Sequence, residues 1–109
     1  MEKRTFNLTN NTMKKVFVPL YKKYYLKIKN GEQDCEIRPL GHRGWNKKNI
    51  YPGRPIVFSN GYGNYDRTEK TILRVVVTDD LKKESIAQWH IDAVNEIYGK
   101  RDQWLIAYI

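Results

Sequence analysis

The shortness of the apolar runs is the feature that most limits what this chain can fold into. Five runs contain the β-branched and aromatic residues that strands prefer, bounded by glycine, proline or polar turn residues. Two other stretches, 20–31 and 86–98, repeat apolar residues at the spacing of an amphipathic helix. The order predicts an α+β domain with a small, curved, mixed sheet of about five to six strands and two helices. The expected strands lie at 15–20, 34–40, 55–60, 69–80 and 103–109.

Several details of these elements follow from single residues. The first helix should carry an apolar face that includes Tyr21 and Ile28, with its lysines on the opposite, solvated face. Ser85 is the expected N-cap of the second helix, and Gly99 is expected to end it. The run 69–80 has an almost continuous apolar middle, so it is predicted to be one long strand in the centre of the sheet.

The chain has 109 residues, which suits one domain at 14–109 preceded by a polar tail at 1–13. One cysteine, Cys35, and two distant histidines, His42 and His90, supply no recognisable metal site, so no metal or cofactor is expected. No window approaches the roughly 18 consecutive apolar residues of a membrane span. The N-terminal residues also lack the apolar run of a secretory signal. We therefore expect a cytoplasmic monomer that makes no contact with membranes.

The positive charge is concentrated in the first half of the chain. The net charge is +8, and residues 1–54 hold 13 Lys and Arg against 4 Asp and Glu, whereas residues 55–109 hold 7 against 8. Such asymmetry favours a polyanionic partner, because bound phosphates release their counterions. Nucleic acid is the expected partner, and a purely solubilising role for the charge is the alternative.

Two charged residues two positions apart mark the second expected strand. Glu36 and Arg38 alternate with the apolar residues around them, so both point to one face, together with Asp34. A carboxylate and a guanidinium placed there could form the polar floor of a ligand pocket. The alternative is an exposed salt bridge, which contributes about 0–1 kcal/mol to stability.

A long irregular connection follows, and it combines an indole with cationic side chains. Trp45 could stack on a base while Arg43, Lys47, Lys48 and Arg54 neutralise phosphates. In the alternative, Trp45 is a buried anchor for the loop and the lysines are only solvated. The next turn is expected to be a hairpin, and it adds three polar side chains that could line the same cleft, namely Ser59, Tyr62 and Tyr65.

The order of elements and the short motifs together resemble the ASCH domain family of the PUA-like superfamily. The matching features are the helix that ends at Asn30 and Gly31, the Gly-x-x-x-x-Glu-x-Arg pattern from Gly31 to Arg38, and the "QWLIAYI" ending. The resemblance covers residues 16–109. It implies a β-barrel-like fold with a cleft that is floored by the Glu-x-Arg strand and binds RNA or a modified nucleoside.

One branch of this family hydrolyses N4-acetylcytidine with a catalytic lysine and threonine. In this chain Gln33 and Glu36 occupy those two positions, and neither can perform the replaced residue's chemistry. The sequence therefore favours a module that binds nucleic acid, with RNA preferred, or a modified nucleoside. A nucleoside- or RNA-directed hydrolase is the alternative, with Glu36 as general base. A protein-interaction domain that uses the tyrosine-rich helix is a third hypothesis.

Overall fold

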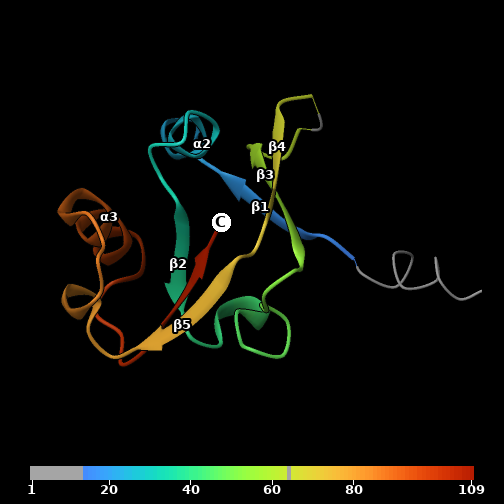
Figure 1. Cartoon of the computed structure of the whole chain (residues 1–109). Coiled ribbons are helices and arrows are strands. Elements are labelled where there is room, and N and C mark those ends of the chain that lie inside the picture. The colour runs from blue at the N-terminus through green and yellow to red at the C-terminus, as the bar shows by residue number, and fades with distance from the viewer. Residues whose placement is uncertain (1–13, 64) are drawn as a thin grey trace, which may run out of the picture.

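A computed structural model describes residues 14–63 and 65–109 (Figure 1). The tail expected at 1–13 lies outside the described residues. Two short 3₁₀ turns, at His42–Gly44 and Leu81–Lys83, interrupt the connections. The helices and strands are β1 Val16–Leu20, α2 Lys22–Lys29, β2 Cys35–Pro39, β3 Pro55–Asn60, β4 Arg67–Thr71, β5 Arg74–Thr78, α3 Gln88–Tyr98 and β6 Trp104–Tyr108.

The strands form two three-stranded sheets. In one sheet, with order β1-β3-β4, β1 runs parallel to β3 and β4 runs antiparallel to it. In the other sheet, with order β2-β6-β5, both pairings are antiparallel. The predicted α+β class with two helices is confirmed. The predicted single mixed sheet of about five to six strands is not, because the six described strands form two sheets. The described strands close no barrel, because the two sheets remain separate.

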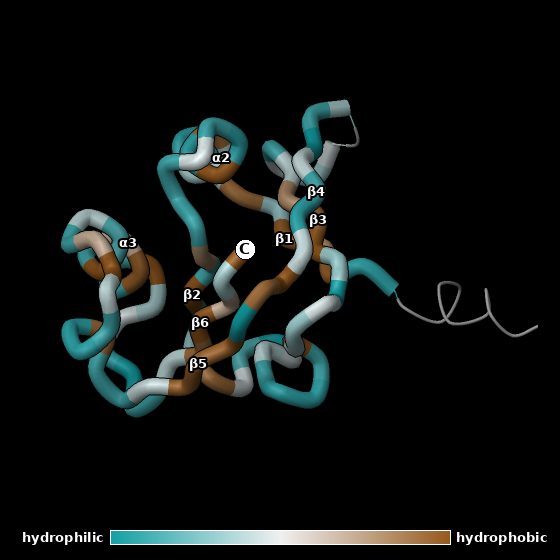
Figure 2. The backbone as a smooth tube through the Cα atoms, in the orientation of Figure 1, coloured by the Kyte–Doolittle hydropathy of each residue, from teal (hydrophilic) through white to brown (hydrophobic). Residues whose placement is uncertain are grey.

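The central strand β6 joins two hydrophobic clusters. Its side chains alternate between the two faces of the sheet, as the period of two in a strand requires. Leu105 packs in one cluster with Tyr25 and Phe58, whereas Ile106 packs in the other with Ile91. Figure 2 shows the apolar colour on β2, β5 and β6 and also on β1 and β3, whereas the loops and β4 are mostly hydrophilic.

Each helix packs on a different sheet. Helix α2 packs on β1 and β3, and helix α3 packs on β2 (Figure 1). The predicted apolar face of α2 is confirmed for Ile28, which is fully buried, but Tyr21 is exposed at the N-cap position. None of the described helices has the length and apolar character needed to cross a membrane.

The prediction of a single long strand at 69–80 is wrong, because this range contains parts of two strands. The chain leaves the first sheet after Thr71 and enters the second at Arg74, so β4 and β5 are edge strands of different sheets. At the crossing, the Ile72 amide donates to the Arg54 carbonyl and the Leu73 amide donates to the Tyr108 carbonyl. At the crossing Ile72 is buried, whereas Leu73 is 67% exposed. The apolar run therefore spans the switch between the sheets and the start of the edge strand β5, and it is not a central strand.

The predicted start of α3 is also wrong, whereas its end is confirmed. The helix begins at Gln88, and Ala87 occupies the N-cap position without a side-chain hydrogen bond. Ser85 therefore does not cap the helix. Gly99 ends it with a φ of 73°, a left-handed conformation in which glycine carries no Cβ penalty.

Candidate functional site

Glu36 and Arg38 form an ion pair on β2 that is largely withdrawn from solvent. The Arg38 Nε atom donates to Glu36 Oε2 at 2.9 Å, and the two side chains are 17% and 7% exposed. The alternative of a solvent-exposed salt bridge is therefore wrong. Burial raises the pKa of Glu36, although Arg38 and Gln33 oppose this shift. Burial alone would lower the pKa of Arg38, but the adjacent Glu36 carboxylate raises it.

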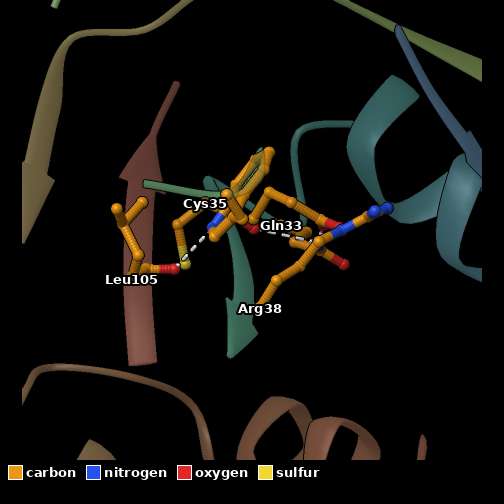
Figure 3. Close-up of polar contacts among 6 residues, drawn as sticks. Gln33, Cys35, Arg38 and Leu105 are labelled. Carbon is orange, nitrogen blue, oxygen red and sulfur yellow. Dashed lines mark hydrogen bonds and ion pairs between the residues drawn. The ribbon is translucent and has the colours of Figure 1, made fainter. Parts of the chain in front are cut away.

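Gln33 completes this polar group from the turn that precedes β2. Its Nε2 atom donates to the Cys35 carbonyl at 2.9 Å and lies 3.4 Å from Glu36 Oε1. Figure 3 shows Gln33 and Arg38 together beside β2, with the terminal nitrogens of Arg38 directed away from Leu105 and Cys35. Sequence reasoning did not select Gln33, because strand alternation does not extend into a turn. The only available signal was its position in the family motif.

A cleft of about 320 Å³ lies against this polar group. Gln33, Glu36 and Arg38 contribute its polar part, and both helices contribute apolar and aromatic walls. A mostly apolar wall with a few convergent polar groups is typical of small-molecule sites. The other lining residues are Pro19, Leu20, Tyr21, Tyr24, Ile37, Gly61, Tyr62, His90, Ala93, Val94, Ile97 and Tyr98.

Four tyrosines line the cleft, namely Tyr21, Tyr24, Tyr62 and Tyr98. Tyr62 lines the cleft, is 81% exposed and influences the pKa of Arg38. Tyr98 was not predicted; burial raises its pKa, so it stays a neutral hydroxyl at pH 7. Tyr65 is exposed but does not line the cleft. Ser59 is buried, and its hydroxyl donates to the Gly61 carbonyl within the hairpin.

The prediction that Trp45 stacks on a base is wrong, because the residue is buried. The residue is 4% exposed, and its Nε1 atom donates to the Leu105 carbonyl at 2.9 Å. Its ring centroid lies 5.4 Å from the Arg38 Cζ atom. The alternative in which Trp45 anchors the loop therefore applies, and the indole supports Arg38 without being available to a base.

The cations of the loop do not converge on the cleft as a group. Lys47 and Lys48 are exposed and do not line it. Arg54 holds the loop in place, because its Nε atom donates to the Lys14 carbonyl at 2.9 Å and its Nη1 atom donates to the Asn49 carbonyl. Arg43 does not line the cleft either, but it follows His42 in a short turn, and the His42 ring centroid lies 5.2 Å from that of Tyr98.

Two further cations near the cleft were not predicted. Lys23 Nζ lies 5.0 Å from the ring centroid of Tyr24, on the α2 wall. Arg101 lines a different pocket, but its Nε atom donates to the Tyr98 carbonyl at 3.0 Å, and its charge acts on Tyr98 together with that of Arg43. Lys23, Arg43 and Arg101 therefore place positive charge near two of the tyrosines that line the cleft.

The cysteine and the nearby histidine form no nucleophilic pair. Cys35 Sγ lies 3.9 Å from His90 Nδ1, and both residues are buried. Burial, with the neighbouring carboxylates, raises the pKa of Cys35 to about 12, and burial lowers that of His90 to about 4. Both groups are neutral at pH 7, so the thiolate that nucleophilic chemistry needs does not form.

No protein-family model matches the chain, and no curated protein or solved structure matches it. The resemblance to the ASCH family therefore stays a prediction. Within residues 14–63 and 65–109, no three His, Cys, Asp or Glu side chains gather to hold a metal ion. The function is therefore inferred from the cleft and from the charged residues near it.

Proposed function

We propose that this chain is an RNA-binding module that takes one unstacked base into the cleft between α2 and α3. The same cleft would accept a free modified nucleoside. The observation that carries the proposal is the buried Glu36–Arg38 pair in a cleft of about 320 Å³. That volume is near the lower end of the range of roughly 300–1,000 Å³ for ligand sites. It suits one nucleoside and is too small for a duplex.

The surroundings of the cleft support the same proposal. Tyr21 and Tyr62 are exposed at the cleft, where an aromatic ring can stack on a base. Lys23, Arg43 and Arg101 lie near Tyr24 and Tyr98, where they can neutralise the phosphates that flank an inserted base. Single-stranded RNA is favoured, because its unstacked bases can be recognised on their edges.

The resemblance to the ASCH family supports this assignment. It implies a PUA-like barrel and an RNA- or nucleoside-binding cleft floored by the Glu-x-Arg strand. The two three-stranded sheets would be the open form of such a barrel. Glu36 and Arg38 are the positions on which the resemblance and the cleft geometry agree.

Binding of labelled single-stranded RNA and DNA oligomers at several salt concentrations tests the proposal. We expect binding that weakens as salt rises, and at least a tenfold loss of affinity in Arg38→Ala. Lys48→Ala is the matched control, because this lysine is exposed away from the cleft, and it should lose no more than about twofold. Absence of RNA binding at 50 mM salt, or equal losses in the two variants, would overturn the proposal.

A hydrolase is the second candidate, and the position of Glu36 favours it. This carboxylate lines the cleft, and burial raises its pKa, as is common for a general base. Incubation with N4-acetylcytidine and with RNA, for the wild type and Glu36→Gln, tests this role. Hydrolysis that disappears in the variant would support it, and unchanged substrates after long incubation would remove it.

A further inference from the structure

Gln33 has an unused hydrogen-bond acceptor at the cleft. Among the described residues, its Oε1 atom is the one buried side-chain N or O atom without a hydrogen-bond partner. The Nε2 atom faces two acceptors, the Cys35 carbonyl and Glu36 Oε1, so this orientation of the amide is fixed. Gln33 is 5% exposed and lines the cleft, and we take a ligand that enters there as the source of the donor that Oε1 lacks.

Arg38 offers the complementary donors in the same cleft. Within the described ranges, the Arg38 side chain donates a hydrogen bond from Nε alone, which leaves Nη1 and Nη2 for a ligand. The Trp45 ring on one side and Glu36 along the Nε edge fix the guanidinium. The ligand edge must therefore present an acceptor to Arg38 and a donor to Gln33.

The charge of this group selects against an anion in the cleft. Glu36 pairs with Arg38 at 2.9 Å, so the two charges largely cancel within the buried polar group. A phosphate would gain little there and would meet the Glu36 carboxylate. A neutral, planar base edge fits better, and the phosphates are left to Lys23, Arg43 and Arg101.

From these contacts we infer that the cleft selects a nucleobase with an exocyclic amino group beside a ring acceptor, as in cytosine or adenine. The amino group donates to Gln33 Oε1, and the ring nitrogen accepts from Arg38. Uracil and hypoxanthine place a carbonyl oxygen where the amino group would be, so two acceptors would face each other. A site built around such a hydrogen bond discriminates strongly against the analogue that lacks it.

This inference rests on the proposed function, and one experiment separates the two. The affinity of the wild type is measured for short oligocytidine and oligouridine of equal length, and for oligoadenosine and oligoinosine, at one salt concentration. We expect at least tenfold tighter binding of the amino-bearing member of each pair. Equal binding within both pairs would overturn the inference and leave the proposed function intact. Absence of binding to all four oligomers would overturn both.

A variant locates the preference at Gln33. Gln33→Met keeps the approximate length of the side chain and removes the Oε1 acceptor together with the Nε2 donor, so it should reduce the preference for cytidine over uridine to about twofold or less. Gln103→Met is the control, because Gln103 is exposed near the start of β6 and should retain the full preference. A Gln33→Met protein that keeps the preference would contradict the assignment. Thermal unfolding of both variants shows whether they fold, and the wild-type comparison decides the inference if Gln33→Met does not.

Discussion

Trp45 fixes the position of Arg38 through its own burial. The indole donates to the Leu105 carbonyl of the central strand, and its ring lies beside the Arg38 guanidinium. One side chain therefore connects the long loop, β6 and the polar part of the cleft. Its replacement should affect stability directly and ligand binding only through Arg38.

Trp45→Phe should lower the free energy of unfolding by about 2–3 kcal/mol. The change removes the donor to a buried carbonyl, which costs about 1–3 kcal/mol, and leaves a small cavity. Urea unfolding followed by circular dichroism measures the loss. Trp89→Phe, at a partly exposed position, should cost less than about 1 kcal/mol. Unchanged stability with a tenfold loss of RNA affinity would restore the stacking role of Trp45.

His90 should make the protein less stable in acid. Burial lowers its pKa from 6.5 to about 4 in the folded state, so the unfolded chain binds the proton more readily. Stability contributed by the neutral imidazole is present above pH 6.5 and is lost as the pH falls towards 4. The shift corresponds to about 3 kcal/mol.

The difference in unfolding free energy between the wild type and His90→Gln isolates this effect. Glu36 acts in the opposite direction, because its raised pKa favours the folded state at low pH, but it is present in both proteins. We expect the wild type to lose about 3 kcal/mol relative to His90→Gln between pH 6.5 and pH 4. A difference that stays constant with pH would show that His90 titrates normally.

Among the elements, the loop between β2 and β3 is held in place by the side chain of one arginine, which donates hydrogen bonds to backbone carbonyls. Arg54 reaches the Lys14 carbonyl before β1 and the Asn49 carbonyl within the loop. Its charge is therefore used within the fold, although sequence reasoning assigned it to phosphate binding. Arginine and lysine should not be equivalent at this position.

Arg54→Lys should lower the free energy of unfolding by about 1–2 kcal/mol and leave RNA affinity within about twofold of the wild type. Lysine keeps the charge but cannot donate to both carbonyls with the same geometry. Chemical unfolding and RNA titration are measured on the same preparation, with Lys48→Arg as the control. An affinity loss without a stability loss would indicate that Arg54 contacts phosphate.

Most elements were predictable because local patterns determine them. The period of two placed Glu36 and Arg38 on one face of β2, and the helical spacing placed Ile28 in the core. The switch between sheets at Ile72 and Leu73 was not predictable, since it depends on hydrogen bonds to distant carbonyls. The change from the polar β4 to the apolar β5 is visible in the sequence, but it does not show that the two strands belong to different sheets.

The composition of the cleft was predictable only in part. Glu36, Arg38 and Tyr62 were predicted and do line it. Gln33 and Tyr98 reach it through the turn before β2 and the last residue of α3, where no local pattern indicates a site. Trp45 was misassigned because sequence shows that an indole is present but not whether it faces solvent.

At the scale of the whole molecule, binding should depend on the cations near the cleft more than on the total charge of +8. Lys23→Ala and Arg43→Ala should each reduce the slope of log affinity against log salt by about one. Lys82→Ala, at an exposed residue beyond β5, should leave that slope unchanged. Equal effects of all three changes would mean that binding follows net charge alone.

The most direct test of the account is a crystal structure of the protein with a short single-stranded RNA that contains cytidine. We expect one base inserted between α2 and α3, with its edge within hydrogen-bonding distance of Arg38 and Gln33. The flanking phosphates should lie near Lys23, Arg43 or Arg101. An RNA bound along Lys47 and Lys48, with no base in the cleft, would contradict it.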